Sequence, residues 1–288
     1  MLTQSHCTID DIEFSFGKGK KNGPPLLLLH GLTFRWQLFE SLISSFEPDW
    51  QVYALDFRGH GGSARSRSGD YEYDQLVNDT AAFIESEIGK NTVLIGYSLG
   101  GAVAAKVAGQ LPNLVRAVVI IDNFLFWDSL QAVRTDPLIS TMFRSIQALV
   151  RQTRSPKDLA GSISDISVPL PEAGQRIRLS ELFPPAFIAR WAESVAEIDP
   201  GVISVLLGEV PPENFDGEAI LKAIACPLLL LQANPALGGL LPDRDVERAR
   251  AIQPATQHIK FDQLGHMMYL QDPTAVSSAI VSFLETVS

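Results

Sequence analysis

The sequence predicts an α/β fold in which a mostly parallel central sheet carries helices on both faces. Short apolar runs alternate with longer amphipathic runs over most of the 288 residues. This alternation is typical of parallel strands that are buried between two layers of helices. Hydrophobic residues make up 46% of the chain and charged residues 19%, so we expect a large core and no global disorder. The length suits one large domain, or a core domain with an insertion.

The first part of the chain contains four expected strands and three expected helices. The strands are 25–31, 50–57, 92–98 and 115–122, and the helices are 34–46, 73–89 and 100–111. Each strand is a nearly continuous apolar run, as in "PLLLLHG" at 25–31. In the helix 73–89, Leu76, Thr80, Phe83 and Ile84 fall on one face, and Gly89 ends the pattern.

Residues 123–215 interrupt this alternation. They contain helical stretches at 137–152 and 184–198, with proline and glycine at the joints, and no convincing strand. We therefore expect a helical cap inserted after the strand that ends at Asp122. Ligand sites of parallel sheets lie beyond the carboxyl ends of the strands, so this cap is predicted to be a lid. The predicted division is a core domain of 1–122 and 216–288 and a lid of 123–215.

The alternation resumes after the predicted lid. Strands are expected at 226–233 and 256–262, with a helix at 243–253 between them. A last helix is expected at 272–287, with Asp272 as its N-cap and Pro273 at its first position.

Composition excludes several classes of function. The formal net charge of −10 disfavours nucleic acid and anionic membranes as partners. Two cysteines far apart in sequence, Cys7 and Cys226, make neither a disulfide framework nor a zinc pattern. No signal peptide is visible, and no apolar run reaches the ~18 residues that span a bilayer. We expect a cytoplasmic protein without metal or organic cofactor, and the sequence leaves its oligomeric state open.

The stretch "GYSLGG" at 96–101 lies where an expected strand meets an expected helix. In such a G-x-S-x-G turn the serine adopts a strained backbone conformation, and glycine is needed two residues before and after it. Ser98 would then be exposed at the top of the sheet. The helix that begins at Leu99 would aim its free N–H groups at the same point, where a negative charge can develop.

Four stretches occur in the order that one family shows: "LLLLHG", "ALDFRGHGGSARS", "GYSLGG" and "LGHMMYLQDP". Over residues 12–288 the chain resembles the α/β-hydrolase family. The resemblance implies that Ser98 is a nucleophile, that His266 is its base, and that the N–H groups of Leu32 and Leu99 bind the oxyanion. His30 and His60 are expected to shape loops, and no role is expected for His6 or His258.

The acid of the triad stays open between two positions. The family usually places its carboxylate after the strand expected at 226–233, where this chain has Asn234, a residue without negative charge. Some members take the acid from the end of an earlier strand, where this chain has Asp122. Asn234 could itself orient His266 or be an engineered replacement. Asp243 and Asp245 are expected to cap a helix.

The predicted activity is that of a serine hydrolase acting on a carboxylic ester, lactone or related acyl compound. C–C bond hydrolysis and perhydrolysis are alternatives on the same fold, and a non-catalytic ligand-binding protein is another. Epoxide hydrolysis and dehalogenation would normally need an aspartate nucleophile, which disfavours both. Aromatic and sulfur-containing side chains predict an apolar or aromatic acyl substrate, unless they simply pack lid against core. They are Trp36, Tyr97, Phe124, Phe126, Trp127, Met267 and Met268, with Phe143, Phe183, Phe187 and Trp191 in the predicted lid.

Overall fold

The computed structural model describes residues 2–69, 71–152, 155–170, 174–208 and 215–287, which contain one eight-stranded sheet. The strand order is β1-β2-β4-β3-β5-β6-β9-β10. The six strands from β4 to β10 in this order run parallel to one another. Strand β2 pairs antiparallel with both of its neighbours, β1 and β4. The predicted fold class is therefore confirmed. The strands are β1 (Thr3–Ile9), β2 (Ile12–Lys18), β3 (Pro25–Leu29), β4 (Gln51–Leu55), β5 (Thr92–Tyr97), β6 (Val115–Ile121), β9 (Leu228–Ala233) and β10 (Gln257–Phe261).

The β1–β2 hairpin is absent from the predicted elements. Its two strands are joined at Asp10 and Asp11, which both have positive φ angles, 47° and 62°. Two-residue hairpin turns favour such angles at both positions, and aspartate tolerates them. The signal was therefore an Asp-Asp pair between two runs of alternating residues. It was weak because most of β1 is exposed at the edge of the sheet.

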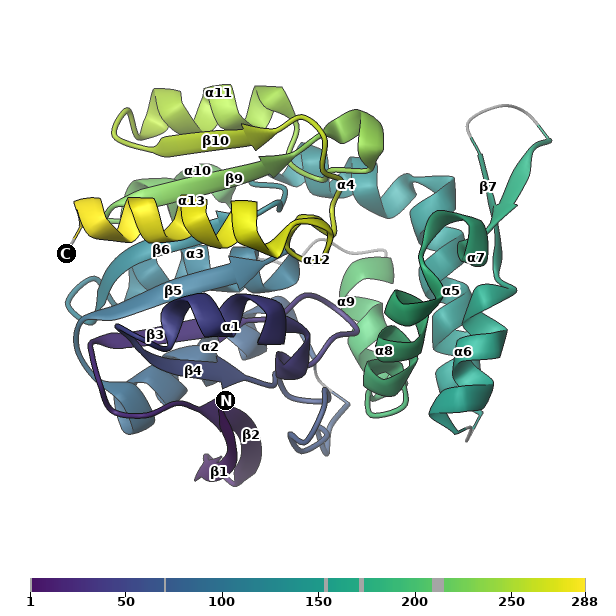
Figure 1. Ribbon diagram of the computed structural model, residues 1–288, viewed down its shortest axis with the longest axis horizontal. Helices are drawn as coiled ribbons and strands as arrows, with labels where there is room; N and C mark the ends of the chain where they lie inside the picture. Colours follow the sequence, from purple (N-terminus) through teal and green to yellow (C-terminus); the bar gives the residue numbers. More distant parts are fainter. Residues whose placement is uncertain (1, 70, 153–154, 171–173, 209–214, 288) are drawn as a thin grey trace.

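Helices cover both faces of the sheet (Figure 1). One face carries α1 (Glu40–Phe46), α12 (Met268–Gln271) and α13 (Pro273–Thr286), and the other carries α2 (Tyr73–Phe83), α3 (Leu99–Gln110), α10 (Gly217–Ala223) and α11 (Asp243–Ile252). Two shorter helical turns, η1 (Trp36–Phe39) and η2 (Ile84–Ile88), adjoin α1 and α2.

The strand β3 shows why the central strands read as continuous apolar runs. Leu26 and Leu28 pack into the core on one face of the sheet, and Leu27 and Leu29 pack into the core on the other. Since successive side chains of a strand point to opposite faces, a strand that is covered on both sides needs apolar residues at every position.

The described residues between 127 and 207, called here the α4–α9 segment, lie beyond the carboxyl ends of the parallel strands (Figure 1). A two-stranded sheet within this segment corrects the expectation that it holds no strand: residues 167–169 pair with residues 176–178. Each of these strands is only three residues long and lies next to a helix, so neither contains a long apolar run that would predict a strand. The elements are α4 (Trp127–Thr135), α5 (Pro137–Val150), α6 (Pro156–Ser164), β7 (Ser167–Pro169), β8 (Arg176–Arg178), α7 (Leu179–Leu182), α8 (Pro185–Val195), η3 (Pro200–Ile203) and α9 (Ser204–Leu207).

No helix in the described ranges combines the length and the apolar character that crossing a bilayer requires.

Candidate active site

Ser98 occupies a sharp turn between β5 and α3. Its φ and ψ angles are 51° and −123°, a conformation that side-chain-bearing residues rarely adopt. The Ser98 N–H donates to the carbonyl of Ile121 over 3.0 Å, and the Ser98 carbonyl accepts from the N–H of Gly101 over 2.7 Å. These bonds fix the turn to β6 on one side and to the first turn of α3 on the other.

The glycines around Ser98 are required by close backbone approaches. A Cβ atom at Gly96 would collide with the carbonyl of Gly100, and one at Gly100 would collide with the carbonyl of Leu29 on β3. A backbone carbonyl cannot rotate away as a flexible side chain can. The turn therefore closes only with glycine at both positions, as the G-x-S-x-G pattern predicts.

His266 follows β10, and its ring contacts a carboxylate. The His266 Nδ1 atom lies 2.7 Å from Oδ2 of Asp122, directly after β6. The Asp122 side chain is fully buried, whereas the His266 side chain is 21% exposed. Asp122 also has a positive φ angle of 44°.

Backbone N–H groups surround the Asp122 carboxylate. Its Oδ1 accepts from the N–H of Ala233 at 3.0 Å and of Leu241 at 3.3 Å, and its Oδ2 accepts from the N–H of Leu240 at 2.8 Å. Together with His266 they give the buried carboxylate four hydrogen-bond donors. Such bonds stabilise the charged form and offset the cost of burial.

The other three candidates for the acid bond elsewhere. The Asn234 side chain accepts from the N–H of Ala236 and donates to the carbonyl of Asp262, so it caps a short turn. Asp243 accepts from Lys260 and Gln232, and Asp245 accepts from the Leu125 N–H and the Ser129 hydroxyl. Within the described ranges, Asp122 alone of the four is hydrogen-bonded to His266.

Ser98 and His266 form no hydrogen bond in the described part of the chain. Both side chains are partly accessible, and the Tyr97 ring beside Ser98 lies 4.8 Å from the His266 ring, centroid to centroid. Catalytic hydrogen bonds are often formed only once substrate is bound, so this arrangement is compatible with a Ser–His pair.

His30 fixes the loop that follows β3. Its Nε2 accepts from the N–H of Phe57 at 3.1 Å, so its proton is on Nδ1, which donates to the carbonyl of Gly31 at 2.8 Å. Burial, reinforced by the neighbouring His60, holds the pKa of His30 well below its usual value. The neutral ring thereby sets the Gly31–Leu32 peptide group, whose N–H belongs to Leu32.

His60 likewise fixes the loop, at the next peptide group, whose N–H belongs to Thr33. Its Nε2 accepts from the N–H of Thr33 at 3.4 Å, and its Nδ1 donates to the carbonyl of Arg58 at 3.1 Å. Burial lowers the pKa of His60 to about 4, so the ring is neutral at physiological pH. The contacts agree with the expectation that His30 and His60 shape loops.

Two backbone N–H groups, those of Leu32 and Leu99, donate to no acceptor in the described ranges. Leu99 is the first residue of α3, where helical N–H groups lack partners within the helix. Both residues border the same narrow gap, together with Val202 and Val205 of the α4–α9 segment. The geometry thus brings together the two residues expected to bind an oxyanion.

Tyr97 and Met267 lie beside His266. The Tyr97 hydroxyl is 3.1 Å from the Met267 sulfur, and the buried Tyr97 ring stacks on Phe34 with centroids 6.0 Å apart. Phe34 is absent from the predicted pocket residues. Its signal was its position three residues after the glycine of "LLLLHG". The Phe34 ring also packs edge-on against Phe187 of α8 at 6.3 Å.

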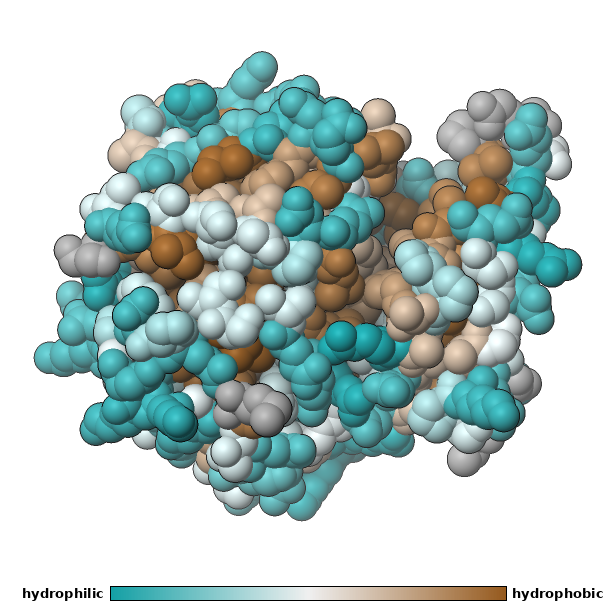
Figure 2. Space-filling view, in the orientation of Figure 1, coloured by the Kyte–Doolittle hydropathy of each residue, from teal (hydrophilic) through white to brown (hydrophobic). Residues whose placement is uncertain are grey.

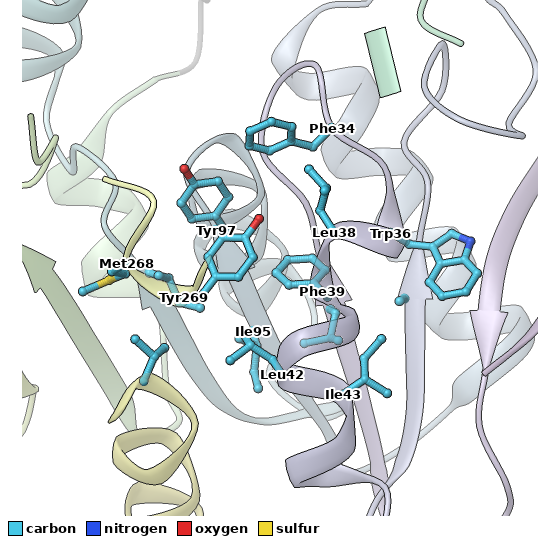
Figure 3. Close-up of a cluster of buried hydrophobic side chains, with 14 of the residues drawn as sticks. Phe34, Trp36, Leu38, Phe39, Leu42, Ile43, Ile95, Tyr97, Met268 and Tyr269 are labelled. Carbon is cyan, nitrogen blue, oxygen red and sulfur yellow. The ribbon is translucent and has the colours of Figure 1, made fainter. Parts of the chain in front are cut away.

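The remaining predicted pocket residues have other main contacts. The Trp36 indole packs against Gly17 of β2 and points away from Tyr97 (Figure 3). Phe126 belongs to the core on the opposite face of the sheet from Tyr97, under the guanidinium of Arg248. Phe124 packs on Phe215, and Trp127 packs on Arg134. Residue type alone did not reveal these directions.

A hollow separates the sheet-bearing body from part of the α4–α9 segment, and hydrophobic residues lie along its walls (Figure 2). It opens where the parallel strands end, which is the end of the sheet that carries Ser98, Asp122 and His266.

Comparison with known proteins agrees with this geometry. Residues 24–273 match the model of the α/β-hydrolase fold family. The chain belongs to the α/β-hydrolase family. It is 27% identical over 282 residues to a serine hydrolase-like protein of Danio rerio, a match that spans 93% of this chain and 83% of the relative.

Two further family members match over almost their whole length. A pimeloyl-[acyl-carrier protein] methyl ester esterase of Vibrio atlanticus is 22% identical, over 91% of this chain and 95% of its own. The crystal structure of E-2-(acetamidomethylene)succinate hydrolase superposes with a TM-score of 0.76 at 19% identity, covering 99% of this chain and 100% of that one. The family and its hydrolase members support a hydrolase.

Proposed function

We propose that this chain is a serine hydrolase that cleaves a carboxylic ester, lactone or related acyl bond with Ser98, His266 and Asp122. The observation that carries the proposal is the 2.7 Å contact between His266 Nδ1 and the buried Asp122 carboxylate. It occurs at the end of the sheet where Ser98 occupies the strained turn. A charged partner at Nδ1 keeps the proton on Nδ1 and leaves Nε2 free to accept one.

The reaction follows from these positions. His266 Nε2 takes the proton from Ser98 Oγ as that oxygen attacks the acyl carbon. The carbonyl oxygen becomes an oxyanion, which the N–H groups of Leu32 and Leu99 stabilise. The tetrahedral intermediate collapses, His266 gives its proton to the leaving alcohol oxygen, and an acyl-enzyme remains. A water molecule then transfers a proton to His266 and attacks the acyl carbon. As the C–O bond to Ser98 breaks, His266 returns the proton to Ser98 Oγ, which releases the acid and restores the free serine.

Asp122 stabilises the imidazolium that forms in both steps. Its three backbone donors hold it in one orientation, so the His266 ring is positioned by the ends of β6 and β9 and by the loop at 240–241. Ser98 and His266 would come into hydrogen-bond distance when substrate fills the site.

The α4–α9 segment is proposed to act as a lid over this site. Phe34 and Tyr97 on the core side contact Phe187 directly or through one another, and Phe183 and Trp191 extend the aromatic surface on the side of the segment. An acyl group that is apolar or aromatic suits such walls, because its transfer from water to apolar surroundings is favourable.

The experiment is a panel of p-nitrophenyl esters and lactones assayed with the wild type, Ser98→Ala and His266→Ala. We expect turnover of at least one ester class, and a loss of ~10³-fold or more in each variant. The double variant should be no worse than the single variants, since the two side chains act as one unit. Wild-type turnover in either single variant would contradict the assignment.

A further inference from the structure

Helix α8 of the α4–α9 segment is bonded to the loop that contains Leu32. Arg35 pairs with Glu193 at 3.1 Å and with Glu197 at 2.8 Å. The indole Nε1 of Trp191 lies 2.9 Å from the hydroxyl oxygen of Thr33. The loop is thus held from outside the sheet by one helix and its C-terminal extension.

The contact between Trp191 and Thr33 is polar, buried and directional. Trp191 is 2% exposed and Thr33 is 1% exposed. An indole N–H can only donate, so the Thr33 oxygen accepts from it, and the single hydroxyl proton is left for another acceptor. That acceptor is the carbonyl of Leu32, 2.6 Å from the Thr33 oxygen. The relay runs from Trp191 through Thr33 to the backbone of Leu32.

Thr33 needs such support because its backbone is strained. Its φ angle is 67°, in the left-handed region, which β-branched residues rarely adopt. A strained conformation of this kind persists only where the surroundings fix it. The fixed points here are the bond to Trp191 and the weaker bond from the Thr33 N–H to His60.

The two peptide groups that flank Leu32 are consequently held from opposite sides. His30, in the core, binds the Gly31 carbonyl. Trp191, in the α4–α9 segment, directs the Thr33 hydroxyl to the Leu32 carbonyl. His30 therefore fixes the peptide group that carries the Leu32 N–H, and Trp191 acts through Thr33 on the peptide group that follows it.

We propose that Trp191 is a positioning residue for the oxyanion site: its indole N–H orients Thr33, and so couples closure of the α4–α9 segment to the alignment of the Leu32 N–H. The inference rests on the proposed function, since it assigns an oxyanion to that N–H group. It predicts a site that is aligned when α8 is seated and misaligned when α8 is displaced.

The test compares Trp191→Phe with the wild type on a p-nitrophenyl ester. Phenylalanine keeps an aromatic ring against Phe34 and Phe187 and removes the N–H donor. We expect kcat to fall about tenfold with KM within twofold, because misplacing a donor weakens transition-state binding more than substrate binding. Thr33→Val should show the same fall, and the double variant should be no worse than either single variant.

Two controls separate positioning from packing. Thr33→Ser keeps the hydroxyl and should retain kcat within threefold. Trp50→Phe makes the same substitution before the amino end of β4, at the other end of the sheet, where the indole contacts Arg116, and should leave kcat unchanged. If Trp191→Phe keeps wild-type kcat, or if its effect adds to that of Thr33→Val, the inference is wrong. Should Trp191→Phe fail to fold, the Thr33→Val and Thr33→Ser pair decides.

Labelling with a fluorophosphonate distinguishes this failure from failure of the proposed function. A wild-type protein that leaves Ser98 unlabelled would refute the function. Wild-type labelling together with an unchanged labelling rate in Trp191→Phe would refute the inference alone. We expect labelling of the wild type and slower labelling of Trp191→Phe and Thr33→Val.

Discussion

Replacing Asp122 by asparagine changes one oxygen into an NH₂ group and leaves the shape of the side chain unaltered. If the amide oxygen takes the place of Oδ1, it keeps the bonds from Ala233 and Leu241, and the NH₂ group faces His266 and the N–H of Leu240. If it takes the place of Oδ2, the NH₂ group faces the N–H groups of both Ala233 and Leu241. The first orientation loses one backbone bond and the second loses two.

The first orientation is therefore favoured, since a buried donor without a partner costs about 1–3 kcal/mol. In that orientation the amide donates to His266 Nδ1, which moves the ring proton to Nε2. The ring then presents a donor to Ser98 where the reaction needs an acceptor. We expect turnover in Asp122→Asn to fall by ~10²–10⁴-fold, with a loss of stability of about 1–3 kcal/mol from the lost bond.

The assay is kcat for a p-nitrophenyl ester, referred to the fraction of protein that is folded. Asp245→Asn is the matched control, because Asp245 is also a fully buried carboxylate that accepts a backbone N–H, from Leu125. That variant should lose stability and keep its turnover per folded molecule. If Asp122→Asn stays within threefold of wild-type turnover, Asp122 is not the acid.

Three other changes have defined outcomes. Gly100→Val should abolish soluble expression or turnover, because its Cβ would meet the Leu29 carbonyl; full turnover of a soluble variant would show that the turn is ordinary. Asn234→Asp should change turnover less than threefold, since position 234 bonds Asp262 and Ala236, and a tenfold rise would mark it as the acid position. His60 has a folded-state pKa of about 4 and an unfolded one near 6.5, so the unfolded state binds the proton first. The wild type should therefore lose stability between pH 7 and pH 5, and its urea midpoint should fall. The midpoint of His60→Gln should fall less over the same pH range, and an equal fall would contradict a buried neutral ring.

The parallel strands, the turn at Ser98 and the loop position of His266 could be predicted because each depends on local pattern. A strand covered on both faces is apolar at every position, as at Leu26–Leu29. A turn that passes close to a neighbouring strand needs glycine, as at Gly100. Each of these requirements involves only a few consecutive residues, so a single sequence is enough to predict it.

The partner of His266 could not be chosen from sequence because its environment is assembled from distant segments. Asp122 is distinguished by N–H groups at 233, 240 and 241, and a backbone N–H leaves no mark on residue type. Asn234 lies where the family usually has its acid, but its side chain donates to the Asp262 carbonyl. The face of the sheet on which Phe126 packs could not be predicted for the same reason, since an aromatic residue after a strand can face either layer of helices.

The most direct test of the central claim is where an acyl group resides during turnover. Wild-type protein mixed with a p-nitrophenyl ester and quenched within the first turnover should carry one acyl group, which peptide mass mapping should place on Ser98. The acyl group should be absent from Ser98→Ala. Ester turnover with no trapped acyl group on Ser98, or with the acyl group on another residue, would contradict the account.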